Sequence, residues 1–186
     1  MIFDESFKNQ DYTKTRLPKA EYEQCVFESC DFFNSYLDNQ TFLECEFIDC
    51  NLSNANIART TFNEVIFSGC KMMGLKFETL NDFLLALSFI DCNLNLCSFY
   101  QMELKNQRFN GCKMIETDFT EADLSGAVFD NCDLQHVIFS KTNLEKADFL
   151  TALNFKIDPE QNQLKKAKFS TTGIAGLLAK YDIIVS

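Results

Sequence analysis

Cysteine is the residue type most able to do chemistry in this sequence of 186 residues, which contains nine cysteines and one histidine. Structural zinc sites commonly take two ligands from a Cys-x₂₋₄-Cys pair. The nearest cysteines here are five positions apart, and we expect that spacing to place neighbours on different sides of the molecule. The sequence therefore predicts no metal site, and we expect His136 to be a solvated surface residue.

The cysteines follow a regular pattern. Large apolar residues recur every five positions from Leu17 to Phe77 and, after a shift of two residues, from Leu84 to Phe149. Each of the nine cysteines lies two residues before one of these large apolar positions. A period of five fits neither a helix nor a strand, so the chain must turn a corner every five residues. Between residues 20 and 149, neither the large apolar position nor the position two residues before it holds a charged residue, except for Asp82. We therefore interpret both as core positions and the cysteines as buried thiols that fill the smaller one.

Two rows of residues indicate how many corners make one turn. Both rows advance in steps of 20 residues with a single step of 22. The first row consists of Cys30, Cys50, Cys70, Cys92, Cys112 and Cys132. The second row consists of Phe27, Phe47, Phe67, Phe89, Phe109, Phe129 and Phe149. This predicts a solenoid with four sides and like residues stacked vertically. Stacked strands lie roughly 4.8 Å apart, further than the ~3.8 Å between the Cβ atoms of a disulfide, so we expect free thiols.

The repeat resembles the pentapeptide-repeat family, whose motif is a small residue, Asp or Asn, then Leu or Phe, then two variable residues. It is present as Ala122-Asp123-Leu124-Ser125-Gly126 and Ala147-Asp148-Phe149, within a match over about residues 15–149. The resemblance implies an all-β fold, a right-handed quadrilateral β-helix. We expect this β-helix over residues 1–170, with a two-residue slip near 78–83, interpreted as a bulge, and a turn near 154–163.

The last segment, residues 171–186, changes character. Ile174, Leu177, Leu178 and Tyr181 recur at helical spacing, and Asp182–Val185 resembles a short strand. Such a tail can cap the open end of a solenoid. It also resembles the tails of the Qnr-like branch of the family, which implies a tail-to-tail homodimer. The residues expected to form that dimer are Ile174, Leu177, Leu178, Tyr181, Ile183, Ile184 and Val185.

The overall charge argues against two classes of partner. With 17 basic and 27 acidic residues the net charge is −10, which disfavours direct binding to nucleic acid or to an anionic membrane. No secretory signal or membrane span is visible, and the odd number of cysteines suits a reducing compartment, so we expect a cytoplasmic protein. The sequence contains neither a Ser-His-Asp set nor a Gly-rich phosphate loop. We expect no enzyme and no cofactor.

The acidic residues are not evenly distributed over the expected four sides. Two adjacent sides hold 13 acidic and 3 basic residues, against 7 and 5 on the other two. One of the acidic sides carries Glu28, Glu46, Asp49, Asp91, Asp130 and Asp148, and its neighbour carries Glu21, Glu23, Glu44, Glu64, Glu103, Asp123 and Glu145. We interpret these sides as an imitation of the charged DNA backbone.

Two functions follow as hypotheses. Resemblance to the Qnr-like and microcin-immunity proteins implies a DNA mimic that binds DNA gyrase or topoisomerase IV and protects it from an antibiotic or a peptide toxin. The alternative is a scaffold or adaptor that binds another protein through a flat side. Val26, Ile66, Ile90 and Val128, expected on the side of the phenylalanine row, are candidates for an apolar contact strip in that case.

Overall fold

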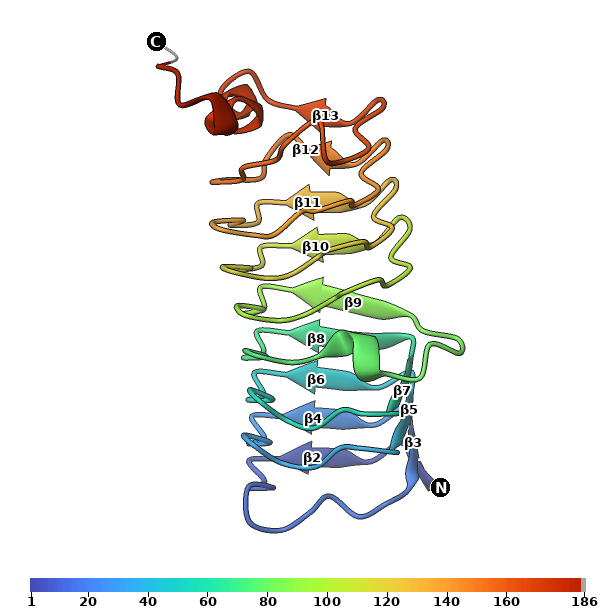
Figure 1. Cartoon of the computed structure of the whole chain (residues 1–186). Coiled ribbons are helices and arrows are strands. Elements are labelled where there is room, and N and C mark those ends of the chain that lie inside the picture. The colour runs from blue at the N-terminus through green and yellow to red at the C-terminus, as the bar shows by residue number, and fades with distance from the viewer. Residues whose placement is uncertain (185–186) are drawn as a thin grey trace.

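The computed structural model describes residues 1–184, which wind into a rod with the N-terminus at one end and the C-terminal tail at the other (Figure 1). Side 1 of the rod carries a four-stranded sheet, and side 2 carries a nine-stranded sheet. Side 1 contains β1 (Ile2–Phe3), β3 (Glu21–Glu23), β5 (Thr41–Leu43) and β7 (Thr61–Asn63). Side 2 contains β2 (Ser6–Lys8), β4 (Val26–Glu28), β6 (Glu46–Ile48), β8 (Val65–Ser68), β9 (Leu87–Ile90), β10 (Arg108–Asn110), β11 (Val128–Asp130), β12 (Asp148–Phe149) and β13 (Lys168–Phe169).

The register confirms a turn of twenty residues. Neighbouring strands are parallel, Phe47 pairs with Phe67, and the single step of 22 joins Phe67 to Phe89. The other two sides are held by isolated parallel bridges, such as Asn93 with Lys113 on side 3 and Ser98 with Asp118 on side 4. The predicted all-β, four-sided solenoid is therefore confirmed, with the two named sheets on adjacent sides.

The corners explain why the chain can turn every five residues. Corner residues adopt left-handed backbone conformations; one corner stacks Asp49 (φ 52°), Gly69 (φ 64°), Asp91 (φ 53°) and Gly111 (φ 65°). Asn, Asp and Gly tolerate this region better than other residues do. The side chain of the motif's Asp or Asn accepts hydrogen bonds next to the corner. The Asp123 carboxylate, for example, accepts hydrogen bonds from the backbone N–H of Ser125 (2.9 Å) and the amide of Asn143 one turn later (3.1 Å).

The core consists of the two predicted positions. Phenylalanine rings stack along the rod, and Phe109 lies between Phe89 and Phe129 at centroid distances of 5.5 and 5.3 Å. All nine cysteines are buried free thiols, as predicted. Their position has a further role that the sequence analysis missed. The Cys70 thiol donates to the carbonyl oxygen of Phe47 (3.2 Å), and the Thr117 hydroxyl makes the equivalent bond to Leu94 (2.8 Å), so the small position satisfies a buried carbonyl in the coil below.

We expect none of the nine thiols to react quickly in the native protein, because all nine are buried and a reagent in solution cannot reach them. Burial raises the pKa of the Cys45 thiol to about 11 and that of Cys97 to about 12, so both remain protonated at neutral pH. Only the thiolate attacks a disulfide reagent. A chromogenic disulfide reagent should therefore count close to zero thiols in buffer and all nine in denaturant. Fast release from even two cysteines of the folded protein would contradict this packing.

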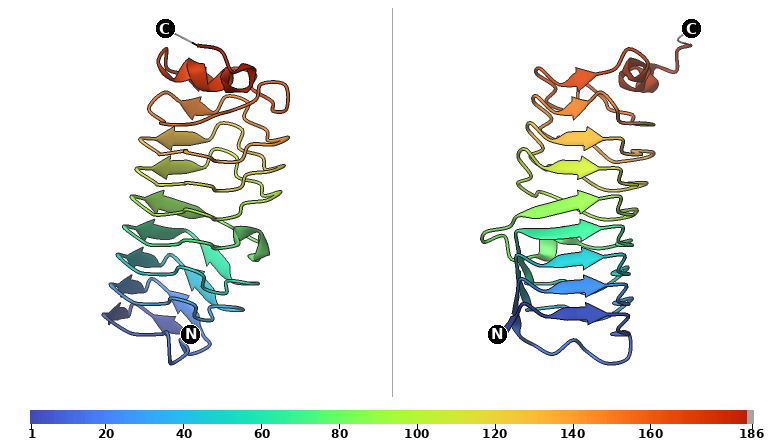
Figure 2. Two further views of the ribbon diagram at one scale, coloured as in Figure 1. Left: turned by 60° about the vertical axis from the view of Figure 1, so that its left-hand side comes forward. Right: turned by 180° about the vertical axis from the view of Figure 1, so that it is seen from behind.

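The slip differs from the expected bulge. A 3₁₀ helix, η1 (Phe77–Thr79), is followed by a loop that projects from the rod between the levels of β8 and β9 (Figure 2). Leu84, which the five-residue period assigned to the core, is 60% exposed, and Phe83 is 69% exposed. That assignment was wrong because the two extra residues carry the chain outward. Leu80 and Leu85 pack against the core from the loop instead.

The tail also differs from the sequence expectation. Residues 173–181 form two short 3₁₀ helices, η2 (Gly173–Leu177) and η3 (Ala179–Tyr181), rather than one regular helix. Asp182–Ile184 form no strand, and Val185 lies outside the described residues. Glycine disfavours a regular helix, and this short segment contains both Gly173 and Gly176. Gly176 lies against the ring and carbonyl of Phe155, where a Cβ atom would collide.

Candidate protein-binding surfaces

Of the thirteen acidic residues that the sequence places on two adjacent sides, we predict that ten bind a partner, and these ten lie on the two sides and their corners. On side 2, Glu28, Glu46, Asp130 and Asp148 belong to strands, and Asp49 and Asp91 occupy the next corner. On side 1, Glu103 and Asp123 pair in one bridge row. Glu44 and Glu64 occupy the corner between the two sides. The twenty-residue turn thus brings these residues onto one continuous part of the surface.

Lysines pair with four of these ten residues. Lys8 contacts Glu28 (2.6 Å), Lys168 contacts Asp148 (3.0 Å), and Lys105 contacts both Glu103 (2.9 Å) and Asp123 (3.5 Å). Exposed pairs of this kind add little stability, but they cancel charge. Burial raises the pKa of Asp148, but hydrogen bonds from the Leu150 N–H and from Lys168 outweigh it, so the pKa is lowered and the carboxylate stays ionised. In the described chain, Glu44, Glu46, Asp49, Glu64, Asp91 and Asp130 have no ion pair.

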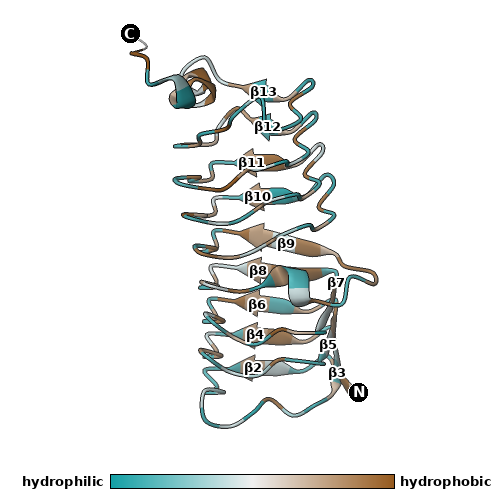
Figure 3. Ribbon diagram, viewed as in Figure 1, coloured by the Kyte–Doolittle hydropathy of each residue, from teal (hydrophilic) through white to brown (hydrophobic). Residues whose placement is uncertain are grey.

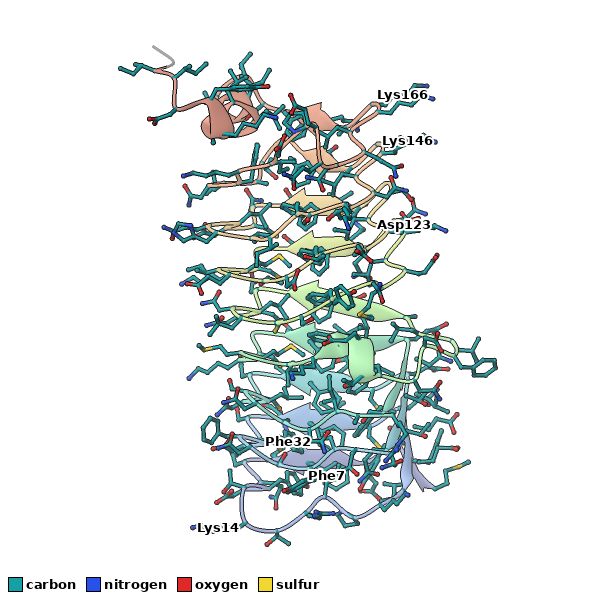
Figure 4. All side chains as sticks on the ribbon, in the orientation of Figure 1. Phe7, Lys14, Phe32, Asp123, Lys146 and Lys166 are labelled. Carbon is teal, nitrogen blue, oxygen red and sulfur yellow. The ribbon has the colours of Figure 1, made fainter. Side chains whose placement is uncertain are left out.

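The negative charge is concentrated in the N-terminal half of sides 1 and 2. We call this region the acidic patch: it contains nine carboxylates with one cation, Lys8, and its acidic members are Asp4, Glu5, Glu21, Glu23, Glu28, Glu44, Glu46, Asp49 and Glu64. Beyond Asp91, the same sides hold five acidic and six basic residues, namely Glu103, Asp123, Asp130, Glu145 and Asp148 with Lys105, Arg108, Lys146, Lys165, Lys166 and Lys168. Figure 4 labels Asp123, Lys146 and Lys166 in this nearly neutral half.

The candidate apolar strip is not continuous. Val26 and Ile66 lie on β4 and β8, and the strand between them places Glu46 in the same row. Ile66 and Ile90 are 36% and 37% exposed, while Val26 and Val128 are half-buried. Figure 3 shows mixed hydropathy along the strands of this side. A partner that used these residues would therefore also contact charged neighbours.

The tail covers the C-terminal end of the rod. Leu177 packs against the core, and the N–H of Ile157 donates to the carbonyl oxygen of Gly176 (3.1 Å). Lys180 contacts the carboxylates of Asp158 (2.7 Å) and Glu160 (2.6 Å), and the Tyr181 hydroxyl donates to Glu160 (3.0 Å). Of the predicted dimer residues, Ile174, Tyr181, Ile183 and Ile184 are at least half exposed, and Leu177 and Leu178 are half-buried.

We expect docking of the tail to depend on pH. Hydrogen bonds from Lys180 lower the pKa values of Asp158 and Glu160, so their contribution is complete above the ordinary carboxyl pKa and is lost as the pH falls through the lowered values. The same contacts raise the pKa of Lys180, so a second loss occurs at strongly alkaline pH. The protection factors of the Leu178 and Tyr181 amides, which are exchange rates corrected for the intrinsic effect of pH, should therefore fall below about pH 4.

A lysine variant separates this contact from general unfolding. Lys180→Gln should lower the protection factors of the same two amides at neutral pH and make them less dependent on pH. Lys165→Gln, which removes an exposed lysine that has no ion pair in the described chain, is the matched control. Equal exchange in both variants would show that the ion pairs do not hold the tail.

The described residues contain no group of three His, Cys, Asp or Glu side chains that could hold a metal ion. His136 is exposed, as expected. In this part of the chain, no helix is long and apolar enough to cross a lipid bilayer.

Comparisons with known proteins agree with the repeat. The profile for pentapeptide repeats (8 copies) matches residues 30–69, and the profile for the pentapeptide repeat region matches residues 86–177. A trypsin-treated variant of QnrB1, a plasmid-mediated fluoroquinolone resistance protein, matches with a TM-score of 0.51 and 19% identity over 100% of this chain and 99% of its own. HetL from Nostoc sp. strain PCC 7120, a pentapeptide repeat protein involved in heterocyst differentiation regulation, matches with a TM-score of 0.51 and 16% identity over 90% and 84% of the two chains.

No sequence relative was found among curated proteins. The two solved structures share the fold at low identity, and the sequence profiles together extend over most of the rod. The chain therefore belongs to the pentapeptide-repeat family.

Proposed function

We propose that this protein is a non-enzymatic DNA mimic that binds a type II topoisomerase, DNA gyrase or topoisomerase IV, and protects it from an antibiotic or a peptide toxin. The acidic patch is the observation that carries the proposal. The likeness of the fold to QnrB1, described as a fluoroquinolone resistance protein, supports it.

The charge density of the patch is close to that of DNA. Nine carboxylates and one ammonium give a net charge of −8. The patch extends over four coils, or about 19 Å at roughly 4.8 Å per coil, which is about one charge per 2.4 Å. Duplex DNA carries one charge per ~1.7 Å. A basic groove that accepts DNA would therefore attract this end of the rod more strongly than the nearly neutral C-terminal half.

A homodimer through the tail would complete the arrangement. Tail-to-tail association would bury the exposed Ile174, Tyr181, Ile183 and Ile184 and would place one acidic patch at each outer end. Lys165, Lys166 and Lys168 would then lie near the centre. Charge complementarity predicts that the outer ends, rather than the centre, contact the topoisomerase.

A supercoiling assay tests the proposal directly. Purified protein, added to gyrase in the presence of a quinolone, should restore supercoiling, and it should compete with DNA for the enzyme in a salt-sensitive manner. Supercoiling that stays inhibited, with no binding to either topoisomerase, would reject the function.

The second candidate is a scaffold or adaptor that binds another protein. The fold likeness to HetL, which is described as involved in regulation, favours it, as do the partly exposed Ile66 and Ile90. A partner bound through these residues would be retained at high salt. Capture of such a partner, combined with the absence of topoisomerase binding, would favour the scaffold.

A further inference from the structure

Side 1 contains a gap in backbone pairing. β7 is the last strand of its sheet, and the next row begins at Glu103, which in the described structure pairs with Asp123 above it and with no residue below. The other sides are paired across the same level, by Phe67 with Phe89, Lys71 with Asn93 and Lys76 with Ser98. The gap arises because the chain between Asn81 and Ala86 leaves side 1 as the projecting loop (Figure 2). The two ends of this loop stay bonded to the coil below, where the N–H of Asn81 donates to Thr60 (2.9 Å) and that of Ala86 donates to Phe62 (3.2 Å).

Among the described residues, the gap leaves the N–H and the carbonyl of Glu103 without a backbone partner. In the coil above, the N–H of Asp123 donates to Met102 (2.9 Å), and its carbonyl accepts from Leu104 (2.8 Å), so a residue at this position directs both groups to the coil below. Glu103 occupies the equivalent position. Within residues 1–184, no backbone hydrogen bond joins its N–H or its carbonyl to the coil below. This short edge has the polar groups that an added strand needs.

A cavity of about 560 Å³ lies at the same place. Its apolar lining comes from Phe77, Leu80, Leu85, Tyr100 and Met102. Three carboxylates, those of Glu78, Asp82 and Glu103, also line it, and its lining includes no lysine or arginine. Glu103 forms an ion pair with Lys105, whereas Glu78 and Asp82 form no ion pair in the described chain. The volume lies within the range of about 300–1,000 Å³ that is usual for binding sites.

We propose that this gap binds an extended segment of a partner polypeptide. The segment adds as a strand beneath Glu103, with an apolar side chain in the cavity and a lysine or arginine beside Glu78 and Asp82. Because side chains alternate between the two faces of a strand, the preferred segment alternates basic and apolar residues. A small organic cation would use the carboxylates alone and would leave the Glu103 backbone unpaired. The site lies apart from the acidic patch and does not depend on topoisomerase binding.

A titration of ¹⁵N-labelled full-length protein with the peptide Ac-Lys-Val-Arg-Leu-Lys-NH₂ tests the site by NMR. We expect saturable shifts at the Glu103 amide and in residues 77–86, and at least tenfold slower hydrogen exchange at the Glu103 N–H when the peptide is bound. The acidic counterpart Ac-Glu-Val-Glu-Leu-Glu-NH₂ should produce neither. Shifts without protection of Glu103, or equal shifts with Ac-Arg-NH₂, would overturn strand addition in favour of a simple cation site.

Two further comparisons keep the test independent of folding. Glu78→Lys with Asp82→Lys should weaken peptide binding at least tenfold. Glu116→Lys with Asp182→Lys, a matched reversal of one exposed Glu and one exposed Asp outside both the cavity and the acidic patch, should leave it within twofold. The second comparison leaves the protein unchanged and uses two versions of the basic peptide, each N-methylated at one of the two alternating sets of residues. One of these two peptides should bind at least tenfold more weakly, because its methyl groups replace the N–H groups that face Glu103. Equal binding of both methylated peptides would refute backbone pairing.

Discussion

Phe109→Ala should lower the free energy of unfolding by about 3–5 kcal/mol. The Phe109 ring is fully buried and stacks on Phe89 below and Phe129 above, with interplanar angles of 12° and 11°. It also contacts Phe99 and Phe119 edge-on, at centroid distances of 6.1 and 6.0 Å. Removing it leaves a cavity in the middle of the rod that the rigid coils cannot close. Urea denaturation monitored by circular dichroism measures the loss.

Phe7→Ala is the matched control for position in the rod. Phe7 is only half-buried, in the first coil, and it stacks on one ring, Phe27, at 4.8 Å. Stability in a repeat protein is close to a sum of neighbour contacts, so a terminal ring with one stacking neighbour should matter less. We expect this variant to lose less than half as much free energy as Phe109→Ala. Equal losses at the two sites would contradict stacking as the source of stability.

The regular part of the fold was predictable from the residue pattern because each coil repeats the same packing problem. Once Cys30, Cys50 and Cys70 are placed one turn apart, the side of every residue follows from its position in the period. The first coil obeys the same rule. Ile2, Phe7 and Tyr12 continue the period below Leu17, yet the sequence match began only near residue 15 because Glu5 and Gln10 occupy the small position.

The irregular parts could not be predicted in the same way. The five-residue period predicts the side on which a residue lies only where the chain follows the regular coils. It makes no prediction for segments that leave the coils. Leu84 lies at a core position of the period but is exposed in the projecting loop. Phe155 and Ile157 lie outside the period but are buried beneath the tail. The tail residues have a helical pattern, but the segment contains Gly173 and Gly176 and forms two short 3₁₀ helices that lie against Phe155.

The candidate binding surface was predicted in part. The twenty-residue turn correctly assigned Glu46, Asp148 and Asp123 to their sides, since the register of the strands and bridges follows the repeat. The sum of charge over a whole side concealed its uneven distribution along the rod. The identity of the residues one turn away carries this information: Asp148 is followed by Lys168, whereas Glu44 is followed by Glu64. Sorting charges by coil as well as by side identifies the acidic patch.

Reversing Glu44 and Glu64 to lysine should weaken binding to gyrase or topoisomerase IV by about 10- to 100-fold, or ~1.4–2.8 kcal/mol. The pair lies at the centre of the acidic patch, and the double change reduces the net charge of the patch from −8 to −4. The fold should tolerate it, because Lys146 and Lys166 occupy the same corner with φ values of 60° and 61°, close to those of Glu44 (50°) and Glu64 (54°). Binding should be measured at two salt concentrations, since screening reduces the difference.

Glu116→Lys with Glu121→Lys makes the same change in net charge outside the acidic patch. Both residues lie at corners with φ values of 57° and 60°, so the backbone cost is matched. If the patch imitates DNA, this control should bind almost as well as the natural protein, and only the Glu44 and Glu64 reversal should fail to rescue supercoiling. If both double variants lose affinity equally, net charge alone governs the attraction and the patch has no special role. If neither does, the partner is bound through another surface, and the scaffold function gains support.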